Sequence, residues 1–317
     1  MVMGVLEDFA SCLVYGILNM AESDPLAESL NFFIYDTVKV LLILVIMVFL
    51  VSILRTYITR YRIRKILGKK NEGYGNLLAA LLGVPTPFCS CSAVPLFIAF
   101  VDAGVPLGVT FSFLISAPMV NEIAIALLLG LVGWQVTLLY IIAGLAVAVI
   151  GGILIGRAGL ENQVKTLSGK KFKIKDIKLT TEERIEFAKG ETLRITKKVA
   201  PYILLGIAIG SLIHGYVPVD FLTDIAGPDN PLAVPAAVLI GIPFYSHAGG
   251  TIPIISALIG RGMALGTALA LMMSITALSF PEMMILRSVL KNKLLAVFIG
   301  ILAVSFVLVG LLFNAVV

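Results

Sequence analysis

The sequence predicts an all-α polytopic membrane protein, built as an inverted-topology repeat of two halves. Each half is predicted to contain three spans and a broken, re-entrant helical hairpin. Three observations predict this fold: the apolar composition, the long apolar runs, and a pattern that recurs at a fixed offset. The chain has 317 residues, of which 59% are hydrophobic and 14% charged, and its mean hydropathy is +1.03. Soluble proteins average about 45–50% apolar and about 25% charged residues, so an ordinary soluble enzyme, a disordered chain and a nucleic-acid-binding module are excluded.

The apolar runs define the predicted spans. Runs long enough to cross about 30 Å of hydrocarbon lie at 32–54, 107–130, 133–156, 199–217, 263–286 and 294–315. A shorter run at 9–20 predicts an interfacial or packing helix. We therefore expect four segments: an extracytoplasmic or interfacial start (1–31), a first membrane repeat (32–157), a basic cytoplasmic linker (158–198) and a second membrane repeat (199–317).

Two further apolar stretches, 75–101 and 233–259, are interrupted by proline, glycine and polar residues. Proline removes a backbone donor and clashes with the preceding turn, so neither stretch is expected to form one regular helix. The residues predicted to break or hinge the helices are Pro85, Pro87 and Pro95 in the first stretch and Pro243, Gly249, Gly250 and Pro253 in the second.

The basic residues predict the topology. Of the 24 lysines and arginines, 22 fall between Arg55 and Lys70, between Arg157 and Lys198, or between Arg287 and Lys293. The positive-inside rule places all three clusters in the cytoplasm. A full crossing by 75–101 would put the second cluster outside, whereas a re-entrant hairpin keeps it inside. Arms of about ten residues, at 1.5 Å each, reach roughly mid-membrane, and the same reasoning makes 233–259 a hairpin that enters from the outside.

The two halves match at an offset of 158 residues. The matched pairs are Gly83 with Gly241, Pro85 with Pro243, Pro95 with Pro253, Gly104 with Gly262, Gly108 with Gly266, and Ser116 with Ser274. A shift of two residues then aligns Glu122 with Glu282. Many secondary transporters are inverted repeats with a midplane site at broken helices. The alternative is that these small residues only allow helices to pack closely.

The first break carries a pair of cysteines. Cys89 and Cys91 form a Cys-x-Cys motif with Thr86, Ser90 and Ser92 as polar neighbours, and thiolate sulfur favours soft, thiophilic centres. A redox pair would need Cys-x-x-Cys, and no second pair completes a zinc site, so we expect neither a metal nor a cofactor. The alternative is that each cysteine is a small apolar residue.

Polar residues elsewhere complete the candidate site. His247 occupies the position equivalent to Cys89, and Ser246 precedes it. Ser246, His247 and Asn121 are predicted to bind the solute together with the residues of the first break, Thr86, Cys89, Ser90, Cys91 and Ser92. Glu122 and Glu282 lie inside apolar runs, where carboxylates usually mark ion or proton paths, so both are candidates for proton or ion coupling. The alternative is a protonated Glu that bonds to a broken helix end.

The residues also resemble a known family. The motif Thr86-Pro87-Phe88-Cys89-Ser90-Cys91-Ser92, followed by Pro95-Leu96-Phe97 and Ala117-Pro118-Met119-Val120-Asn121-Glu122, is similar to that of the ArsP-type predicted permeases. The resemblance runs from about residue 32 to the C-terminus. It implies a polytopic permease of prokaryotic membranes, and members of the family export trivalent organoarsenicals such as methylarsenite. Cysteines are implicated in handling arsenic there, and this role would fall on Cys89 and Cys91.

The leading hypothesis is a secondary transporter that exports a small thiophilic solute across the prokaryotic cell membrane, with proton coupling. No Walker A motif is present, so ATP coupling within this chain is not expected. One alternative is a transporter of a sulfur or selenium oxyanion or of another small anion. Another is an intramembrane enzyme with Cys89 as nucleophile and His247 as base. A third is a membrane subunit that anchors or gates a soluble partner through 158–198. The expected partners are a small-molecule solute and lipid but no nucleic acid, and homo-oligomerisation is left open.

Overall fold

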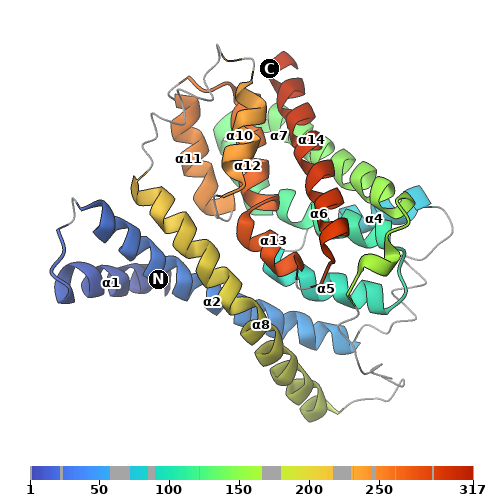
Figure 1. The fold of residues 1–317 in the computed structure, drawn as a ribbon, viewed down its shortest axis with the longest axis horizontal. Helices are drawn as coiled ribbons and strands as arrows, with labels where there is room; N and C mark the ends of the chain where they lie inside the picture. The colour runs from blue at the N-terminus through green and yellow to red at the C-terminus, as the bar shows by residue number, and fades with distance from the viewer. Residues whose placement is uncertain are drawn as a thin grey trace.

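The computed structural model describes residues 2–21, 24–57, 72–84, 90–120, 122–165, 180–216, 230, 232–243, 248–260, 262–287 and 289–316. In this part of the chain nearly every residue is helical, and β structure is limited to one isolated antiparallel bridge between Val164 and Leu290. The helices of the first half are α1 (Val2–Ser11), the π-helical η1 (Cys12–Ile17), α2 (Pro25–Tyr57), α4 (Glu72–Gly83), α5 (Ser90–Asp102), α6 (Leu107–Met119) and α7 (Glu122–Arg157), followed by the short 3₁₀ helix η2 (Glu161–Gln163). Those of the second half are α8 (Thr181–Tyr216), α10 (Ala233–Gly241), α11 (Ala248–Gly260), α12 (Leu265–Ala277), α13 (Phe280–Arg287) and α14 (Asn292–Val316) (Figure 1).

Four described segments are long and apolar enough to cross a membrane. They are Leu26–Leu50 within α2, Leu128–Arg157 within α7, Leu265–Met284 across α12 and α13, and Asn292–Val316, which is α14. The polytopic, all-α character of the chain is thus confirmed, with four such segments in the described residues where the apolar runs predicted six.

The run 107–130 is not the single span that its apolarity predicts. The helix α6 ends at Met119, Val120 is non-helical (φ −114°, ψ 67°), and α7 begins at Glu122. Pro118 lies one residue before the end of α6, where its missing N–H and its ring weaken the last turn of that helix. A second interruption follows at Gly133 (φ 78°, ψ 174°) inside α7.

The run 263–286 is divided in the same way. The helix α12 ends at Ala277, Leu278 is non-helical (φ −125°, ψ 13°), and α13 begins at Phe280. Pro281 is the second residue of α13, near the helix start, where the missing N–H of proline costs nothing. The two long apolar runs that contain Glu122 and Glu282 are therefore each two helices joined by a sharp break.

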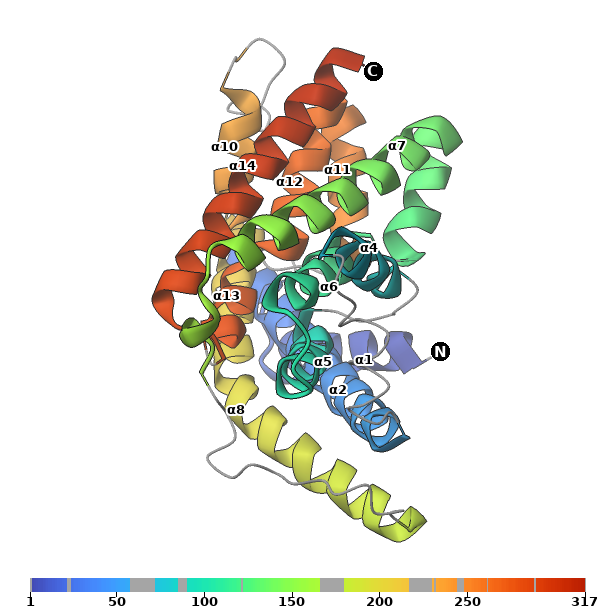
Figure 2. The same ribbon diagram turned by 90° about the vertical axis from the view of Figure 1, so that its right-hand side faces the viewer.

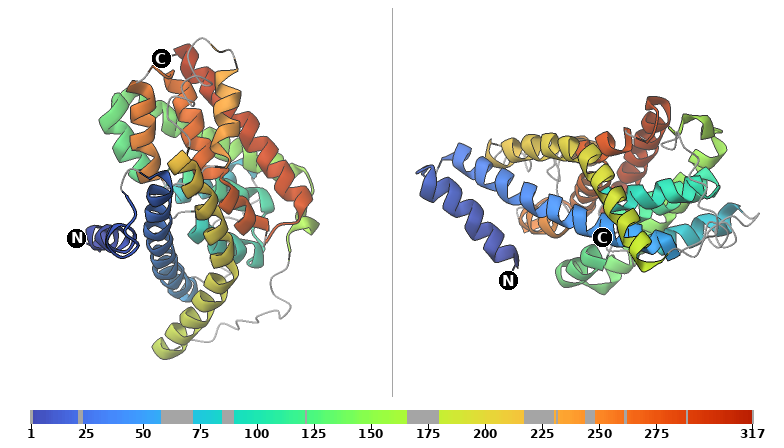
Figure 3. Two further views of the ribbon diagram at one scale, coloured as in Figure 1. Left: turned by 60° about the vertical axis from the view of Figure 1, so that its left-hand side comes forward. Right: turned by 90° about the horizontal axis from the view of Figure 1, so that it is seen from below.

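The helices α2 and α8 form a crossed pair at one side of the molecule. The Arg184 guanidinium donates to Thr56 O at 3.3 Å and to Thr56 Oγ1 at 3.2 Å, so the start of α8 lies against the end of α2. Figure 3 shows α8 crossing α2 and extending beyond the other helices. The predicted linker 158–198 therefore includes the first half of a long helix, and the predicted span 199–217 continues it.

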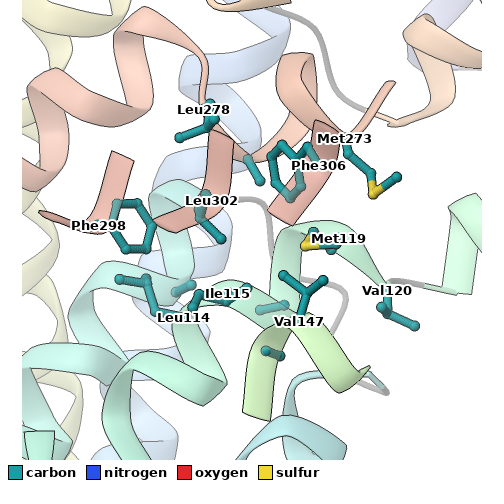
Figure 4. Packing of buried hydrophobic residues seen from close by; sticks show 14 of the residues in the cluster. Leu114, Ile115, Met119, Val120, Val147, Met273, Leu278, Phe298, Leu302 and Phe306 are labelled. Atoms are coloured by element: carbon teal, nitrogen blue, oxygen red, sulfur yellow. The ribbon is translucent and has the colours of Figure 1, made fainter. Parts of the chain in front are cut away.

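One apolar core joins the two halves. Figure 4 shows Leu114, Ile115 and Met119 of α6 on one side of this core and Phe298, Leu302 and Phe306 of α14 on the other. The rings of Phe111 and Phe298 have centroids 5.5 Å apart. Burial of large apolar side chains on both elements stabilises their contact.

Helix ends recur at the offset found in the sequence. The bounds of α11 and α12 lie 158 residues beyond those of α5 and α6. The turns between them contain Gly104 (φ 78°) and Gly262 (φ 97°), where glycine adopts a left-handed conformation without strain. In both turns the residue after the glycine donates its N–H to the carbonyl five residues earlier at 3.0 Å, which is the pattern of a Schellman motif.

A capping box, which Thr180 and Glu183 predict from their spacing, begins α8. The Thr180 N–H donates to Glu183 Oε2 at 2.8 Å, and the Glu183 N–H donates to Thr180 Oγ1 at 3.4 Å. These hydrogen bonds hold the pKa of Glu183 below its usual value.

We expect the first turn of α8 to lose protection as pH falls through that lowered pKa. A carboxyl group with a lowered folded-state pKa stabilises the fold above its unfolded-state pKa, and this contribution disappears as the group is protonated. Amide hydrogen exchange, corrected for intrinsic rates, measures the effect. Glu183→Gln should abolish the pH step, whereas Glu182→Gln should keep it. A wild-type protein without the step would contradict the prediction.

Candidate transport site

A hydrogen bond from a serine, the serine lock, holds α4, the helix before the first break, against α6. Ser116 Oγ donates to the carbonyl of Ala80 in α4 at 2.6 Å. A Cβ atom on Gly83 would lie 2.8 Å from Ser116 Oγ and 3.0 Å from the backbone nitrogen of Ala117. Glycine at position 83 thus allows the approach that this hydrogen bond requires.

The second half contains the same lock. Ser274 Oγ of α12 donates to the carbonyl of Val238 in α10 at 2.6 Å, and a Cβ on Gly241 would lie 2.8 Å from Ser274 Cβ. Each of these residues lies 158 positions beyond its counterpart. In both halves, therefore, the lock fixes the helix end before a break against the helix that precedes a carboxylate.

Removing either hydroxyl should destabilise the fold by about 0.5–1.5 kcal/mol, the usual net contribution of a hydrogen bond. We expect Ser116→Ala and Ser274→Ala to lower the melting temperature in detergent by similar amounts. Ser305→Ala is the matched control, because Ser305 Oγ donates to Ile301 O of its own helix. Equal melting temperatures for all three variants would refute a special role for the interhelical bonds.

The two carboxylates lie at equivalent helix starts in different surroundings. Glu122 is exposed in the first turn of α7, whereas Glu282 is 2% exposed in the first turn of α13. The Phe280 N–H donates to the carbonyl of Ile242 at 2.9 Å, which ties the start of α13 to the bend before Pro243. Glu282 thus lies two residues from a backbone contact with the end of α10.

Each carboxylate-bearing helix packs against a helix of the other half that follows the break in an apolar stretch. The helix α13 contacts α5 (Figure 1), and α11 contacts α7 (Figure 2). The helices α6 and α12 also contact each other. The helices α5 and α13 are therefore parts of one packed unit.

The predicted residues of the first break fall at and before the start of α5. The first turn of α5 contains Ser90, Cys91 and Ser92, and Pro95 lies further along the same helix. Outside the described residues lie Pro85, Thr86, Pro87 and Cys89. Their roles stay predictions.

The second break is described at its two ends. Pro243 lies in the turn after α10 and is half-buried, the first turn of α11 contains Gly249 and Gly250, and Pro253 follows within that helix. Ser246, His247 and Asn121 lie outside the described residues. In the part of the chain that the structure describes, no group of three or more His, Cys, Asp or Glu residues could hold a metal ion.

Tyr140 makes a contact near the candidate site that the sequence did not predict. Its buried hydroxyl donates to the carbonyl of Met119 at 2.7 Å, at the end of α6 just before the break that precedes Glu122. The equivalent residue of the second half is Phe298, which has no hydroxyl group. A lone tyrosine in an aliphatic run is the signal that could have indicated this contact, because buried tyrosine hydroxyls usually find a partner.

Known proteins resemble the chain over most of its length. Residues 25–315 match the family model described as predicted permease, ArsP_1. The UPF0718 protein MJ0584 of Methanocaldococcus jannaschii is 23% identical over 74% of this chain and 80% of its own length. The UPF0718 protein YraQ of Escherichia coli K12 is 24% identical over 93% of this chain and 83% of its own length.

A further relative comes from Streptococcus mutans and is named as a subunit of a two-component membrane permease complex. It is 22% identical over 86% of this chain and 90% of its own length. No solved structure matches the chain. The family match over residues 25–315 and the apolar helices lead to the same conclusion: the chain is a multi-pass protein of the prokaryotic cell membrane and belongs to the ArsP_1 family of predicted permeases.

Proposed function

We propose that the chain is a secondary transporter that exports a small thiophilic solute, with a trivalent organoarsenical such as methylarsenite as the leading substrate. One observation carries the proposal: α5, which opens with Ser90-Cys91-Ser92, packs against α13, whose first turn holds the buried Glu282. Thiolates suit a soft trivalent centre. A carboxyl group nearby can take up or release a proton as the solute moves.

We further propose that the two halves form an inverted-topology repeat with re-entrant hairpins and alternate the access of the solute site. The recurrence of helix bounds, glycine turns and serine locks at 158 residues supports a repeat. The contact between the start of α8 and the end of α2 supports opposite orientations, because these two helices correspond at the same offset. Transporters of this kind bind solutes where broken helices meet.

Uptake of trivalent methylated arsenic into everted vesicles tests the proposal, with and without an imposed proton gradient. We expect gradient-dependent uptake by the wild type and only background uptake by the Cys89→Ser/Cys91→Ser variant. Cys12→Ser is the matched control, since Cys12 is an exposed free cysteine in η1, and it should transport normally. Equal uptake by the double variant and the wild type would overturn the role of the cysteines.

An oxyanion of sulfur or selenium is the second candidate substrate. Helix N-termini attract anions. The helices α5, α7, α11 and α13 each begin after the preceding helix has ended. Selenite uptake in the same vesicles distinguishes the two candidates. An oxyanion held by backbone amides should be transported even by the Cys89→Ser/Cys91→Ser variant, whereas a thiophilic solute should not.

A second protein component is also proposed, because the Streptococcus mutans relative is named as one subunit of a complex. The purified chain alone in proteoliposomes provides the test. Transport by the chain alone would refute the need for a second component. Transport in native vesicles but not in proteoliposomes would support it.

A further inference from the structure

The apolar span of α2 contains an acid and a base near its centre. Asp36 is 5% exposed and Lys39 is 8% exposed, and both lie within the candidate span Leu26–Leu50. Residues three apart on a helix lie on the same face and can interact. Lys39 is outside the three basic clusters that predict the orientation of the chain. The positive-inside rule therefore does not account for a lysine at this position.

Tyr35 and Thr37 are polar neighbours of this pair along α2. Lys39 Nζ lies 4.8 Å from the centroid of the Tyr35 ring, a distance at which the ring face attracts a cation. The hydroxyl of Thr37 is buried and makes no hydrogen bond within the described residues. Ionisable side chains inside spans are costly and usually pair with one another at functional sites.

The elements packed against α2 are α1, η1, α5 and α8. The titratable residues on them whose side chains the structure describes are Glu7 and Asp8 of α1, Cys12 and Tyr15 of η1, and Glu182, Glu183, Arg184, Glu186, Lys189, Glu191, Arg194 and Lys197 of α8. Glu191 binds Arg194 at 2.6 Å. Among the described residues, Lys39 is the charged group that acts on Asp36.

We propose that Asp36 is a proton-binding site inside the span of α2, with Lys39 as its fixed counter-charge. A proton from water adds to a carboxylate oxygen of Asp36, and the pair changes from no net charge to one positive charge on the Lys39 ammonium. Release of the proton restores the neutral pair. No hairpin residue takes part, so this site goes beyond the proposed function and does not depend on the identity of the solute.

Infrared difference spectroscopy of the full-length protein in lipid vesicles tests the proposal with the proton as the only ligand. As the pH falls from about 9 to about 4, we expect a protonated-carboxyl band to appear. This range contains the ordinary pKa values of carboxyl and histidine groups. Asp36→Asn should lose this band, and Glu282→Gln should retain it. Asp36→Glu keeps the assignment testable if Asp36→Asn does not fold, because its band should shift rather than vanish.

Lys39→Met distinguishes a proton site from a permanent ion pair. Loss of the positive charge should let the Asp36 band appear at a proton concentration at least about tenfold lower, since a nearby opposite charge favours the ionised carboxylate. A folded wild type with no Asp36-dependent band over the whole range would overturn the proposal. So would an Asp36 band that does not move in Lys39→Met.

Discussion

Alanine at position 108 or 266 is expected to destabilise the protein by about 1–3 kcal/mol, the range found for overpacked cores. A Cβ on Gly108 would lie 2.5 Å from the carbonyl oxygen of Gly152 and 3.1 Å from Gly156 Cα. These are backbone atoms, which cannot rotate away as the end of a side chain can. The helices α6 and α7 would therefore have to move apart.

The second half provides an independent copy of this contact. A Cβ on Gly266 would collide with the carbonyl oxygen of Gly310 and lie 2.7 Å from the backbone nitrogen of Asn314. Thermal unfolding in detergent should show a similar loss for Gly108→Ala and Gly266→Ala.

The matched control is Gly300→Ala, because a Cβ there meets no atom within 4 Å. Alanine is favoured over glycine in a helix interior by roughly 0.5–1 kcal/mol, so this variant should be unchanged or slightly more stable. If Gly108→Ala were as stable as Gly300→Ala, the close approach of α6 to α7 would be refuted.

The sequence predicted much of the fold because its local signals are strong. The offset of 158 residues identified Gly104 and Gly262, and both adopt the left-handed conformation that only glycine takes readily. It also identified Ser116 and Ser274, which make equivalent interhelical bonds. Small residues at close helix contacts leave a pattern in the sequence because larger ones do not fit.

Hydropathy alone could not predict where helices end inside an apolar run. The run 107–130 has no charged residue before Glu122, yet α6 stops at Met119. Averaged apolarity reports burial or contact with lipid, whereas a helix end depends on proline, caps and tertiary partners. The charges of Asp36 and Lys39 are hidden by the same averaging, because the residues around them are strongly apolar.

The packing of α5 on α13 depends on contacts between residues far apart in the chain, so periodicity and composition carry no signal for it. The same holds for the unequal exposure of Glu122 and Glu282. The sequence presents two equivalent carboxylates, and tertiary packing makes them different.

That difference predicts unequal effects on transport. We expect Glu282→Gln to reduce gradient-driven uptake by roughly 5- to 150-fold, which corresponds to a coupling free energy of about 1–3 kcal/mol. Glutamine matches the shape of glutamate but cannot exchange a proton, and Glu282 is 2% exposed within the packed unit of α13 and α5. Glu122 is exposed, so Glu122→Gln should reduce uptake less.

Uptake into everted vesicles, with and without a proton gradient, measures both variants with whichever solute the wild type transports. Exchange of labelled for unlabelled solute at equal pH on both sides supplies the control, because it needs no net proton movement. Glu282→Gln should retain this exchange while it loses the response to the gradient. Loss of exchange and gradient-driven uptake together would assign Glu282 to solute binding or folding, and an undiminished gradient response would remove it from coupling altogether.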